Sequence, residues 1–361
     1  MTGLTYGASG VDAETADREK AALGRVLSAS LGFRRGMGAS LLEHGYYASA
    51  VRITDTLAVA ITTDGVGSKL LVAEEVGKLD TIGIDCVAMN VNDLICVGAE
   101  PLCMVDYIAL ERLQPGVLEQ VARGLLEGAR QANISIPGGE TAQLPEIIRG
   151  KAPGKGLDLA GTAIGLVEIE KINTGRAVAP GQVVVGLAST GLHSNGFTLA
   201  RRALFAAGKL TVASRVQELG RTVGEELLVP TRIYVREIVE LLQSGLAVKA
   251  MLNITGDGLL NLPRVQAPVA WELDALPPHP PIFDLIRKCG SVVWAEMYRT
   301  FNMGVGFCLV LEESDVDAAC RIARKHGSTP HVIGRVVAGR AGEVRLTKQR
   351  LVAREAGFVP A

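Results

Sequence analysis

The chain has 361 residues, with 37 lysines and arginines against 38 aspartates and glutamates, and a formal charge of −1. Its length predicts two domains. An apolar fraction of 48% supplies ample core and excludes an intrinsically disordered chain. The balanced charge gives no long-range attraction to nucleic acid or to an anionic membrane, so neither is an expected partner. Any anionic ligand must therefore be held by local geometry.

Targeting and redox signals are weak throughout the chain. No apolar run approaches the roughly 18 residues needed to cross a bilayer, and the first ten residues lack the pattern of a signal peptide. The six cysteines form no CxxC pair, and the five histidines have no metal-ligand spacing. Buried reduced thiols are the expected state of these cysteines. We predict a soluble, cytoplasmic protein.

Apolar periodicity predicts the elements of the first half in chain order. A short helix is expected over 16–27, followed by a glycine-rich stretch over 32–38. A strand over 57–62 leads into the turn 63–69, and helices follow over 70–76 and 85–97. Next come a strand over 102–110, an amphipathic helix over 117–132 and a short strand over 134–136 that ends in the turn 137–141. A long strand over 157–168 closes this half.

The polar segment 173–181, punctuated by glycine and proline, predicts the domain boundary, which gives domains 1–172 and 173–361. The second half predicts a strand over 183–188, a helix over 231–242 and a strand over 246–254. A proline-rich loop is followed by a helix over 283–289, a strand over 304–311, a helix over 315–326 and a strand over 331–337. Because several strands are neighbours in sequence, an α/β fold of mixed α+β type is predicted instead of a doubly wound sheet.

Four turns combine glycine with aspartate or threonine between a predicted strand and a predicted helix start, at Asp64, Gly138, Gly191 and Gly256. Helix N-termini present free N–H groups and suit phosphate, although any one turn could be an ordinary cap. The standard nucleotide motifs are absent. Residues 150–156 fall one residue short of a Walker A loop, and Gly65-x-Gly67 lacks the third glycine of the dinucleotide fingerprint.

Several carboxylates lie in apolar or glycine-rich sequence, where an unpaired charge is costly. They are Asp64, Asp85, Asp93, Asp106 and Glu140. A magnesium ion bridging phosphate oxygens would explain several of them together. The alternative is that each caps a helix or pairs with Lys69, Arg123 or Arg299. We favour the metal for Asp64 and Asp93, and both readings stay open for Asp85 and Asp106.

The run DLICVGAEP at 93–101 fits the DxxxxGAxP signature of an ATP-binding superfamily. Within it the chain resembles the aminoimidazole ribonucleotide synthetase (phosphoribosylformylglycinamidine cyclo-ligase) family. The supporting strings occur in the family's order over nearly the whole chain: YGASGVD (6–12), TDGVGSK (63–69), TIGIDCVAMNVND (81–93), PGGETA (137–142), HSNG (193–196), PTRIYV (230–235) and EMYRTFNMGVG (296–306). The last two distinguish this family from the wider superfamily.

The resemblance implies an ATP-dependent ring closure in purine biosynthesis. Formylglycinamidine ribonucleotide and ATP would give aminoimidazole ribonucleotide, ADP and phosphate, through an iminophosphate formed at the amide oxygen. ATP and magnesium are the implied cofactors. The implied architecture is an N-terminal α/β domain that forms a β-barrel across a homodimer, followed by a ferredoxin-like C-terminal α/β domain.

The resemblance also implies residue roles. Lys69, Asp93 and His193 would be catalytic: Lys69 would neutralise ATP phosphates, His193 would polarise the amide, and Asp64 and Asp93 would hold the metal. The nucleotide site would comprise Asp64, Gly65, Gly67, Lys69, Asn92, Asp93, Gly138, Gly139, Glu140 and Thr141. The substrate site would comprise Thr190, His193, Ser194, Asn195, Thr255, Gly256 and Arg299. Arg299 could equally close the domain interface.

The chain departs from the family pattern at two places. Asp257 interrupts the glycine run after Thr255, where it could repel a substrate phosphate, bind metal or face solvent. The stretch 32–38 is also altered, so Arg34 and Arg35 could be surface charges or phosphate ligands. Two other functions stay open: a superfamily relative that phosphorylates another small acceptor, and a non-catalytic ATP-binding subunit.

Overall fold

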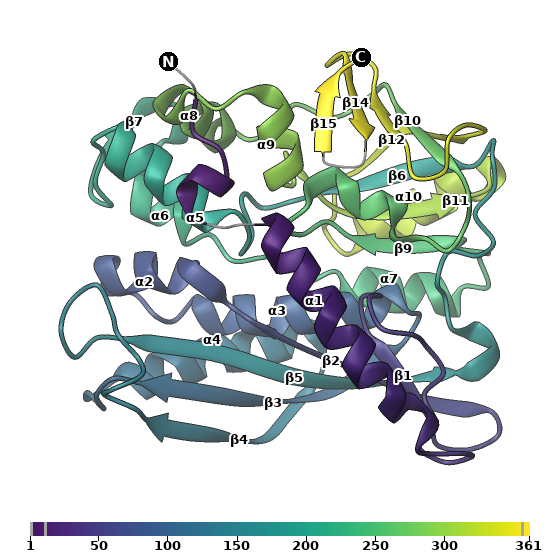
Figure 1. Cartoon of the computed structure of the whole chain (residues 1–361), viewed down its shortest axis with the longest axis horizontal. Coiled ribbons are helices and arrows are strands. Elements are labelled where there is room, and N and C mark those ends of the chain that lie inside the picture. Colours follow the sequence, from purple (N-terminus) through teal and green to yellow (C-terminus); the bar gives the residue numbers. More distant parts are fainter. Residues whose placement is uncertain (1–2, 11–12, 355–356) are drawn as a thin grey trace.

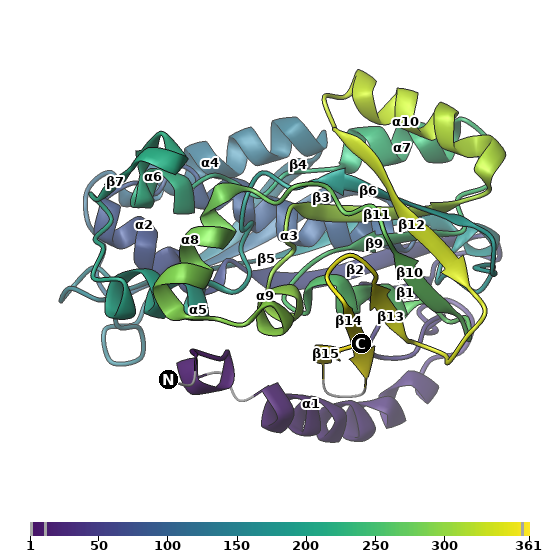
Figure 2. The same cartoon turned by 90° about the horizontal axis from the view of Figure 1, so that it is seen from above.

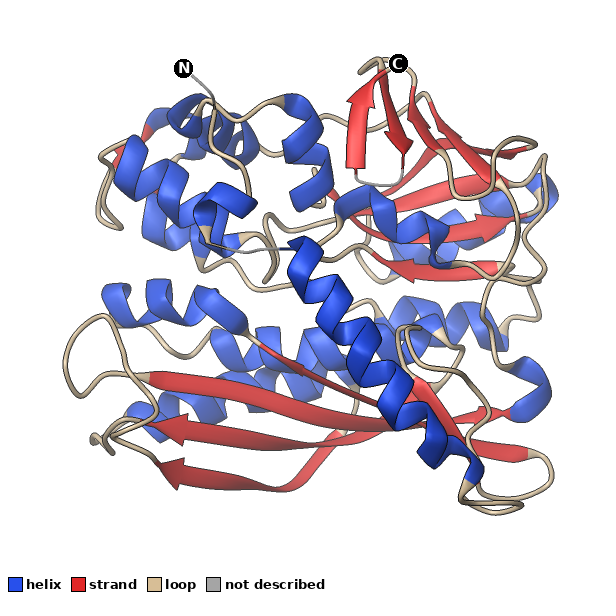
Figure 3. Ribbon diagram, viewed as in Figure 1, coloured by secondary structure: helices blue, strands red, loops and turns tan. Residues whose placement is uncertain are grey.

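The computed structural model describes residues 3–10, 13–354 and 357–361. Its larger strands form two sheets, one from each half of the chain, with helices packed between them (Figure 1). Figure 3 shows the same arrangement with helices and strands distinguished by colour. The mixed α/β class predicted from the sequence is confirmed. None of the described helices is long and apolar enough to cross a membrane.

The N-terminal sheet has the strand order β1-β2-β5-β3-β4, in which β3 and β4 are parallel and the other neighbours are antiparallel. Its strands are β1 (Ser49–Arg52), β2 (Leu57–Gly65), β3 (Glu100–Leu110), β4 (Ser135–Gln143) and β5 (Leu157–Glu168). The helices of this half are α2 (Leu70–Val76), α3 (Ile82–Cys96) and α4 (Val117–Ala132). Every residue of α3 except Asp93 is buried, because α3 lies between this sheet and the second half of the chain.

The two faces of the N-terminal sheet differ. Along β2 and β5, alternate residues are buried on the side that faces α3. On the other side, Leu102, Val105 and Tyr107 of β3 are exposed by 39–43%. A strand alternates its side chains between faces, so this sheet presents a second, open apolar face.

The C-terminal sheet has the order β15-β14-β13-β10-β12-β6-β11-β9. Its strands are β6 (Val183–Ala188), β9 (Ala250–Asn253), β10 (Ala270–Leu273), β11 (Val305–Leu311), β12 (Pro330–Val337), β13 (Val344–Leu346), β14 (Leu351–Arg354) and β15 (Gly357–Pro360). The accompanying elements are α5 (Phe197–Arg201), the ribbon β7 (Arg215–Val216) and β8 (Arg221–Thr222), α6 (Val223–Leu227), α7 (Val235–Gln243), α8 (Pro281–Gly290), α9 (Trp294–Thr300) and α10 (Val316–Lys325). Strands β9 and β11 are buried along their whole length, as their apolar sequences require.

The N-terminal residues 3–10 pack on the second half of the chain, although they precede the N-terminal sheet in sequence. Leu4 donates its N–H to the carbonyl of Gly290 (3.0 Å), and Tyr6 donates its N–H to Oε1 of Glu296 (2.6 Å). The first described residues therefore pack on α8 and α9 of the second half, although the predicted boundary placed them in 1–172. Helix α1 (Ala13–Leu27) lies beside the body of the molecule (Figure 2). Val11 and Asp12 of the YGASGVD string lie outside the described residues.

One predicted turn was wrong, and another is followed by a different kind of helix than expected. Residues 137–141 lie inside β4, because this stretch pairs with β3 as an edge strand. The turn at Gly256 leads into a 3₁₀ helix, η7 (Gly258–Arg264), instead of an α-helix. The predicted helix over 231–242 begins only at Val235, since the residues before it run extended across α3. The turns after β2 and β6 are confirmed.

Candidate functional site

Two carboxylates meet where β2 ends beside α3. Oδ1 of Asp64 accepts the N–H of Gly65 (2.7 Å), and Oδ1 of Asp93 accepts Nδ2 of Asn253 (2.8 Å). Asn90, one turn before Asp93 on α3, donates to the carbonyl of Asp64 (3.2 Å). Burial raises the pKa of Asp93 to about 7, and the charge of Asp64 adds to that rise against the bond from Asn253. The pair is thus an undercompensated negative centre that favours a cation.

This pair fits magnesium. Mg²⁺ is held in proteins by one or two carboxylates, with its other positions filled by water and substrate phosphates. Across the described residues there is no group of three or more histidines, cysteines or carboxylates that could hold a metal without such help. Asp64 and Asp93 therefore suit an ion that arrives with a nucleotide phosphate.

The turn after β2 leaves room for a ligand at its backbone. Gly67 has a φ of +70°, and a Cβ placed there would meet nothing within 4 Å. A side chain would be strained in this conformation, which accounts for glycine at the position. Ser68 then reaches across to the second half, where its hydroxyl lies 3.3 Å from that of Thr198.

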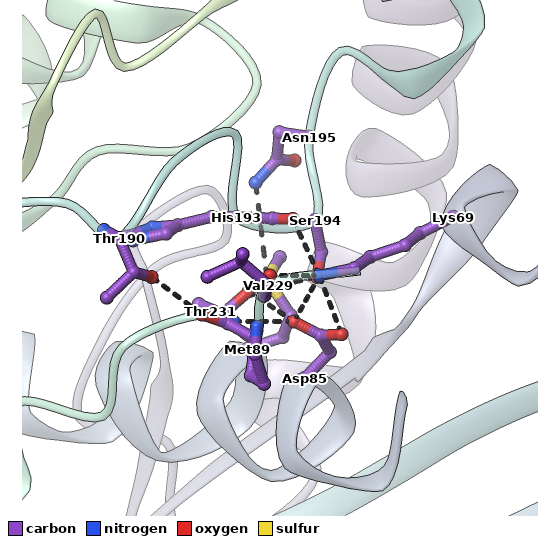
Figure 4. Close-up of polar contacts among 10 residues, drawn as sticks. Lys69, Asp85, Met89, Thr190, His193, Ser194, Asn195, Val229 and Thr231 are labelled. Atoms are coloured by element: carbon purple, nitrogen blue, oxygen red, sulfur yellow. Dashed lines mark hydrogen bonds and ion pairs between the residues drawn. The ribbon is translucent and has the colours of Figure 1, made fainter. Parts of the chain in front are cut away.

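Lys69 does not point into that open space. Its ammonium lies 2.9 and 2.8 Å from the two carboxylate oxygens of Asp85 and donates to the carbonyls of His193 (3.1 Å) and Val229 (2.8 Å). Both side chains are fully buried, and Figure 4 shows the polar contacts around them. An ammonium has three donors, so these partners use all of them. Contact with ATP phosphates would require this cluster to break, and the alternative of an Asp85–Lys69 pair is what the structure shows.

The extended segment 229–234 before α7 hydrogen-bonds to α3 and so joins the two halves; we call it the latch. Thr231 donates both its N–H and its hydroxyl to Oδ1 of Asp85 (2.7 Å each). Asn92 donates to the carbonyl of Arg232 (2.8 Å) and accepts the N–H of Tyr234 (3.0 Å). Asn92 is fully buried. Its amide therefore serves this latch, whereas the sequence analysis placed it in the nucleotide site.

The turn 190–195 folds its histidine inward. His193 has a φ of +63° and is buried, with Nε2 accepting the N–H of Thr190 (3.2 Å). Burial lowers the pKa of His193 to about 3, and the charges of Lys69 and Arg232 add to the effect. The ring is therefore neutral at physiological pH and is no proton donor there. Polarisation of a substrate amide by this ring would need the turn to open.

The hydroxyls of the same turn are also bonded to the protein, at the surface for Thr190 and in a buried position for Ser194. Thr190 donates to the carbonyl of Pro230 (2.6 Å), and the hydroxyls of Ser194 and Thr231 lie 3.0 Å apart. Asn302 holds the turn from outside by donating to the carbonyl of Gly191 (2.9 Å). His193 and Ser194 are thus buried contacts of a fixed turn, whereas Thr190 is exposed and bonds the backbone of Pro230.

Asn195 is the member of that turn that meets the other predicted substrate residues. It is half-buried, and its Oδ1 lies 3.4 Å from where a Cβ on Gly256 would stand. The neighbouring Thr255 donates its N–H and hydroxyl to Oδ1 of Asn261 (2.6 and 3.0 Å). The structure therefore brings Asn195, Thr255 and Gly256 together, on the strand-end side where Asn253 bonds Asp93.

The β4 residues lie elsewhere. The register runs Asp64, Gly161, Asp106, Gly139 across four strands, so Gly139 stands about 14 Å from Asp64 at a usual spacing of about 4.8 Å per strand. A Cβ on Gly139 would lie 2.5 Å from the carboxylate of Asp106. Thr141 shares the face of Gly139, whereas alternation sends Gly138 and Glu140 to the open face. Within one chain, Glu140 and Asp64 are not brought together.

Two arginines singled out in the sequence make local contacts. Arg299 lies against β15, where a Cβ on Gly357 would be 3.1 Å from its Cδ, so its stem packs inside the second half. Arg34 folds over its own loop and donates to the carbonyl of Met37 (3.2 Å).

The near-Walker loop is held by carboxylates. Gly150 and Gly156 donate their N–H groups to Glu111 (3.4 and 3.2 Å). The N–H groups of the next two residues, Lys151 and Ala152, bond Glu74. With these donors occupied, the loop is not a phosphate cradle.

Sequence reasoning missed Asn90, Asn253, Tyr47 and Arg264. Tyr47 donates its hydroxyl to the carbonyl of Asn253 (3.0 Å), and the guanidinium of Arg264 stacks on the ring of Tyr47 at 4.9 Å. These residues come from four separate stretches of chain that carry no shared spacing. Asn90 lies in the motif at 81–93, and this motif was the one signal in the sequence that could have pointed to any of the four.

Family models and curated relatives match nearly the whole chain and point to the same family. Residues 45–167 match the AIR synthase related protein N-terminal domain, and residues 179–347 match the corresponding C-terminal domain. The phosphoribosylformylglycinamidine cyclo-ligase of Methanocaldococcus jannaschii is 45% identical over 92% of both chains. That of Methanothermobacter thermautotrophicus is 46% identical over 95% of this chain and 97% of its own.

Solved structures share the fold at lower identity. Thiamine-monophosphate kinase from Stenotrophomonas maltophilia has a TM-score of 0.59 and 20% identity, covering 88% of this chain and 94% of its own. Hydrogenase maturation protein HypE in complex with ATP has a TM-score of 0.57 and 20% identity, covering 79% and 80%. Two domain matches and relatives above 40% identity over nearly the full length leave one assignment. The chain belongs to the phosphoribosylformylglycinamidine cyclo-ligase family, built from the two AIR synthase related domains.

Proposed function

We propose that this protein is an ATP-dependent cyclo-ligase that closes the ring of formylglycinamidine ribonucleotide to give aminoimidazole ribonucleotide, ADP and phosphate, a step of purine biosynthesis. The observation that carries the proposal is the 45–46% identity to cyclo-ligases over at least 92% of both chains. The structure supports it with a paired-carboxylate centre beside an open glycine turn. The alternatives of another acceptor or a non-catalytic subunit have no observation in their favour.

The chemistry asks for phosphate positioning more than for acid–base groups. The terminal phosphoryl group of ATP passes to the amide oxygen as its bond to ADP breaks. The neighbouring nitrogen then attacks the same carbon, loses its proton, and the carbon–oxygen bond breaks to release phosphate. Asp64 and Asp93 would hold magnesium, which when bound supplies charge neutralisation at the phosphates. Asn195 and the backbone at Gly256 are placed to orient the substrate opposite them.

Lys69 and His193 act in this scheme by keeping the site in shape. The Lys69–Asp85 pair holds the turn 190–195 through the carbonyl of His193 and the latch through that of Val229. The neutral ring of His193 then fixes Thr190. By fixing the turn 190–195, Lys69 and His193 would position Asn195 without contacting the substrate themselves.

We also propose a homodimer formed through the open face of the N-terminal sheet, which would give the β-barrel implied by the family. The exposed Leu102, Val105 and Tyr107 support it, since a soluble monomer rarely leaves such a face bare. Glu140 lies on that face and would belong to the interface. In the second half, α7 and α10 pack together beside the antiparallel strands β6, β11 and β12, which suits a ferredoxin-like unit. We keep the domain boundary at 172/173, between the two family matches.

The test is ADP release by the purified protein with magnesium-ATP, with and without formylglycinamidine ribonucleotide, and with direct detection of the aminoimidazole product. Product formed in step with ADP supports the proposal. ATP hydrolysis or phosphorylation of thiamine monophosphate, without that product, would replace it with the small-molecule kinase alternative. ATP binding with no turnover of either compound would support the non-catalytic alternative.

A further inference from the structure

Arg264 stands at the C-terminal end of η7 with its side chain two-thirds buried, at an exposure of 33%. The guanidinium lies 4.9 Å over the ring of Tyr47, and one nitrogen is 3.4 Å from Oδ2 of Asp257. Tyr47 is itself buried and hydrogen-bonded through its hydroxyl to Asn253. The cation is therefore held in one place by the protein interior.

That place is near Asp93, one of the two carboxylates that we propose hold the metal. The charge of Arg264 lowers the pKa of Asp93, and Asp93 in turn raises the pKa of Arg264. A short chain of contacts fixes the geometry: Arg264 stacks on Tyr47, Tyr47 bonds Asn253, and Asn253 bonds Asp93. Lys69, the cation expected at the phosphates, is instead neutralised by Asp85 inside the protein. Arg264 thus supplies positive charge to the accessible part of the site.

The guanidinium has donors to spare. It carries five N–H groups in one plane, and stacking on Tyr47 occupies a face of that plane and no donor. The contact with Asp257 is at the long limit of a hydrogen bond, and the carboxylate of Asp257 is 66% exposed. Such a contact is a weak counter-ion, which a phosphoryl group with two negative charges and three acceptor oxygens would outcompete.

We propose that Arg264 binds a phosphoryl group of a substrate at the Asp64–Asp93 centre, and that Asp257 is its counter-ion in the free enzyme and is displaced on binding. This inference rests on the proposed function. The phosphoryl group belongs either to the terminal phosphate of ATP or to the 5′-phosphate of the ribonucleotide. The assignment gives Asp257, which departs from the family's glycine run, a defined partner and a role in setting affinity.

The test compares wild-type protein with Arg264→Met, Arg264→Lys and Asp257→Asn, measuring kcat and the KM of each substrate separately. Loss of a charge-assisted, bidentate contact predicts a rise of about tenfold to hundredfold in the KM of one substrate for Arg264→Met. Arg264→Lys should recover part of it. Asp257→Asn should lower the same KM a few fold, and should have no such effect in an Arg264→Met background. Arg176→Met, at an exposed arginine bonded to Gln266, is the matched control.

The outcomes separate cleanly. A rise in the KM of ATP assigns the terminal phosphate, and a rise in the KM of the ribonucleotide assigns its 5′-phosphate. If both constants stay within twofold of wild type while the urea midpoint falls, Arg264 is only a stacking partner of Tyr47 and the inference is overturned. If wild-type protein makes no product, the proposed function fails, and titration with magnesium-ATP and with inorganic phosphate still tests Arg264. Equal affinities of wild type and Arg264→Met for both probes would then reject it.

Discussion

Replacing Lys69 by methionine should destabilise the protein by about 3–5 kcal/mol, because it leaves the carboxylate of Asp85 buried without its cation. The same change also frees the carbonyls of His193 and Val229, which accept from the ammonium. Native domains are stable by only about 5–15 kcal/mol, so this loss is a large share of the total. Methionine matches the length and apolar stem of lysine, which leaves packing nearly unchanged. Urea denaturation followed by fluorescence measures the free energy of unfolding.

Kinetics decide between this structural role and a phosphate contact. If Lys69 is an internal ion pair, the KM for ATP in the folded fraction should change less than about threefold. The double variant Lys69→Met/Asp85→Asn should recover part of the lost stability, since no buried charge is then left alone, and it also serves if the single variant does not fold. Lys171→Met, which breaks the exposed pair with Glu168, should leave the urea midpoint nearly unchanged, because solvent screens such a pair. Near-wild-type stability together with a tenfold rise in the KM for ATP would refute the reasoning.

Three further predictions follow from the same geometry. Asp93→Asn should raise the magnesium concentration for half-maximal rate by about tenfold or more, because it removes a ligand charge; an unchanged titration would remove Asp93 from the metal site. The folded-state pKa of His193, about 3, lies below that of an unfolded histidine near 6.5, so the unfolded state alone binds this proton between those values. The free energy of unfolding should therefore fall as pH falls through that window, by about 1.4 kcal/mol per pH unit from this group. His193→Asn, which tolerates the positive φ, should reduce this pH dependence. Urea titrations at pH 6.5 and 4.5 measure it, and an equal loss of stability in wild type and variant would contradict the prediction. Val105→Glu on the open sheet face should shift the protein to monomers in sedimentation velocity, whereas Leu126→Glu, at an exposed leucine of α4, should not; equal sedimentation of both variants would place the interface elsewhere.

Local patterns carried much of the fold. Helix α4 repeats apolar residues every three or four positions, and β5 alternates buried and half-buried residues, so both were predicted to within a residue. Residues 137–141 misled because Pro-Gly-Gly is typical of a turn, yet β4 is an edge strand, where proline and glycine are tolerated. Helix α7 began late because Asp85 and Asn92, more than 130 residues earlier in the chain, hold the preceding backbone extended.

The candidate site likewise combines residues that the sequence indicates with contacts that only the fold creates. Asp64 and Asp93 were proposed from residue type, since carboxylates beside glycine turns have a chemical meaning before folding, whereas Asn195 was proposed only from the family resemblance. Whether a lysine reaches a phosphate or pairs inside the protein depends on which side of a turn it emerges and on what packs against it. Lys69 therefore pairs inside the protein with Asp85, and the phosphate contact that we propose falls to Arg264, for which the sequence predicted no role.

By itself the sequence determined the family, the reaction class and most of the longer helices and strands, because each of these depends on short runs of residues. The tertiary structure alone decided which charges are exposed and which are neutralised. It set Arg264 near Asp93 and paired Asp85 with Lys69, and it placed two strands, β5 and β3, between Glu140 and Asp64. Electrostatic roles depend on distance and burial, and both are properties of contacts between segments far apart in sequence.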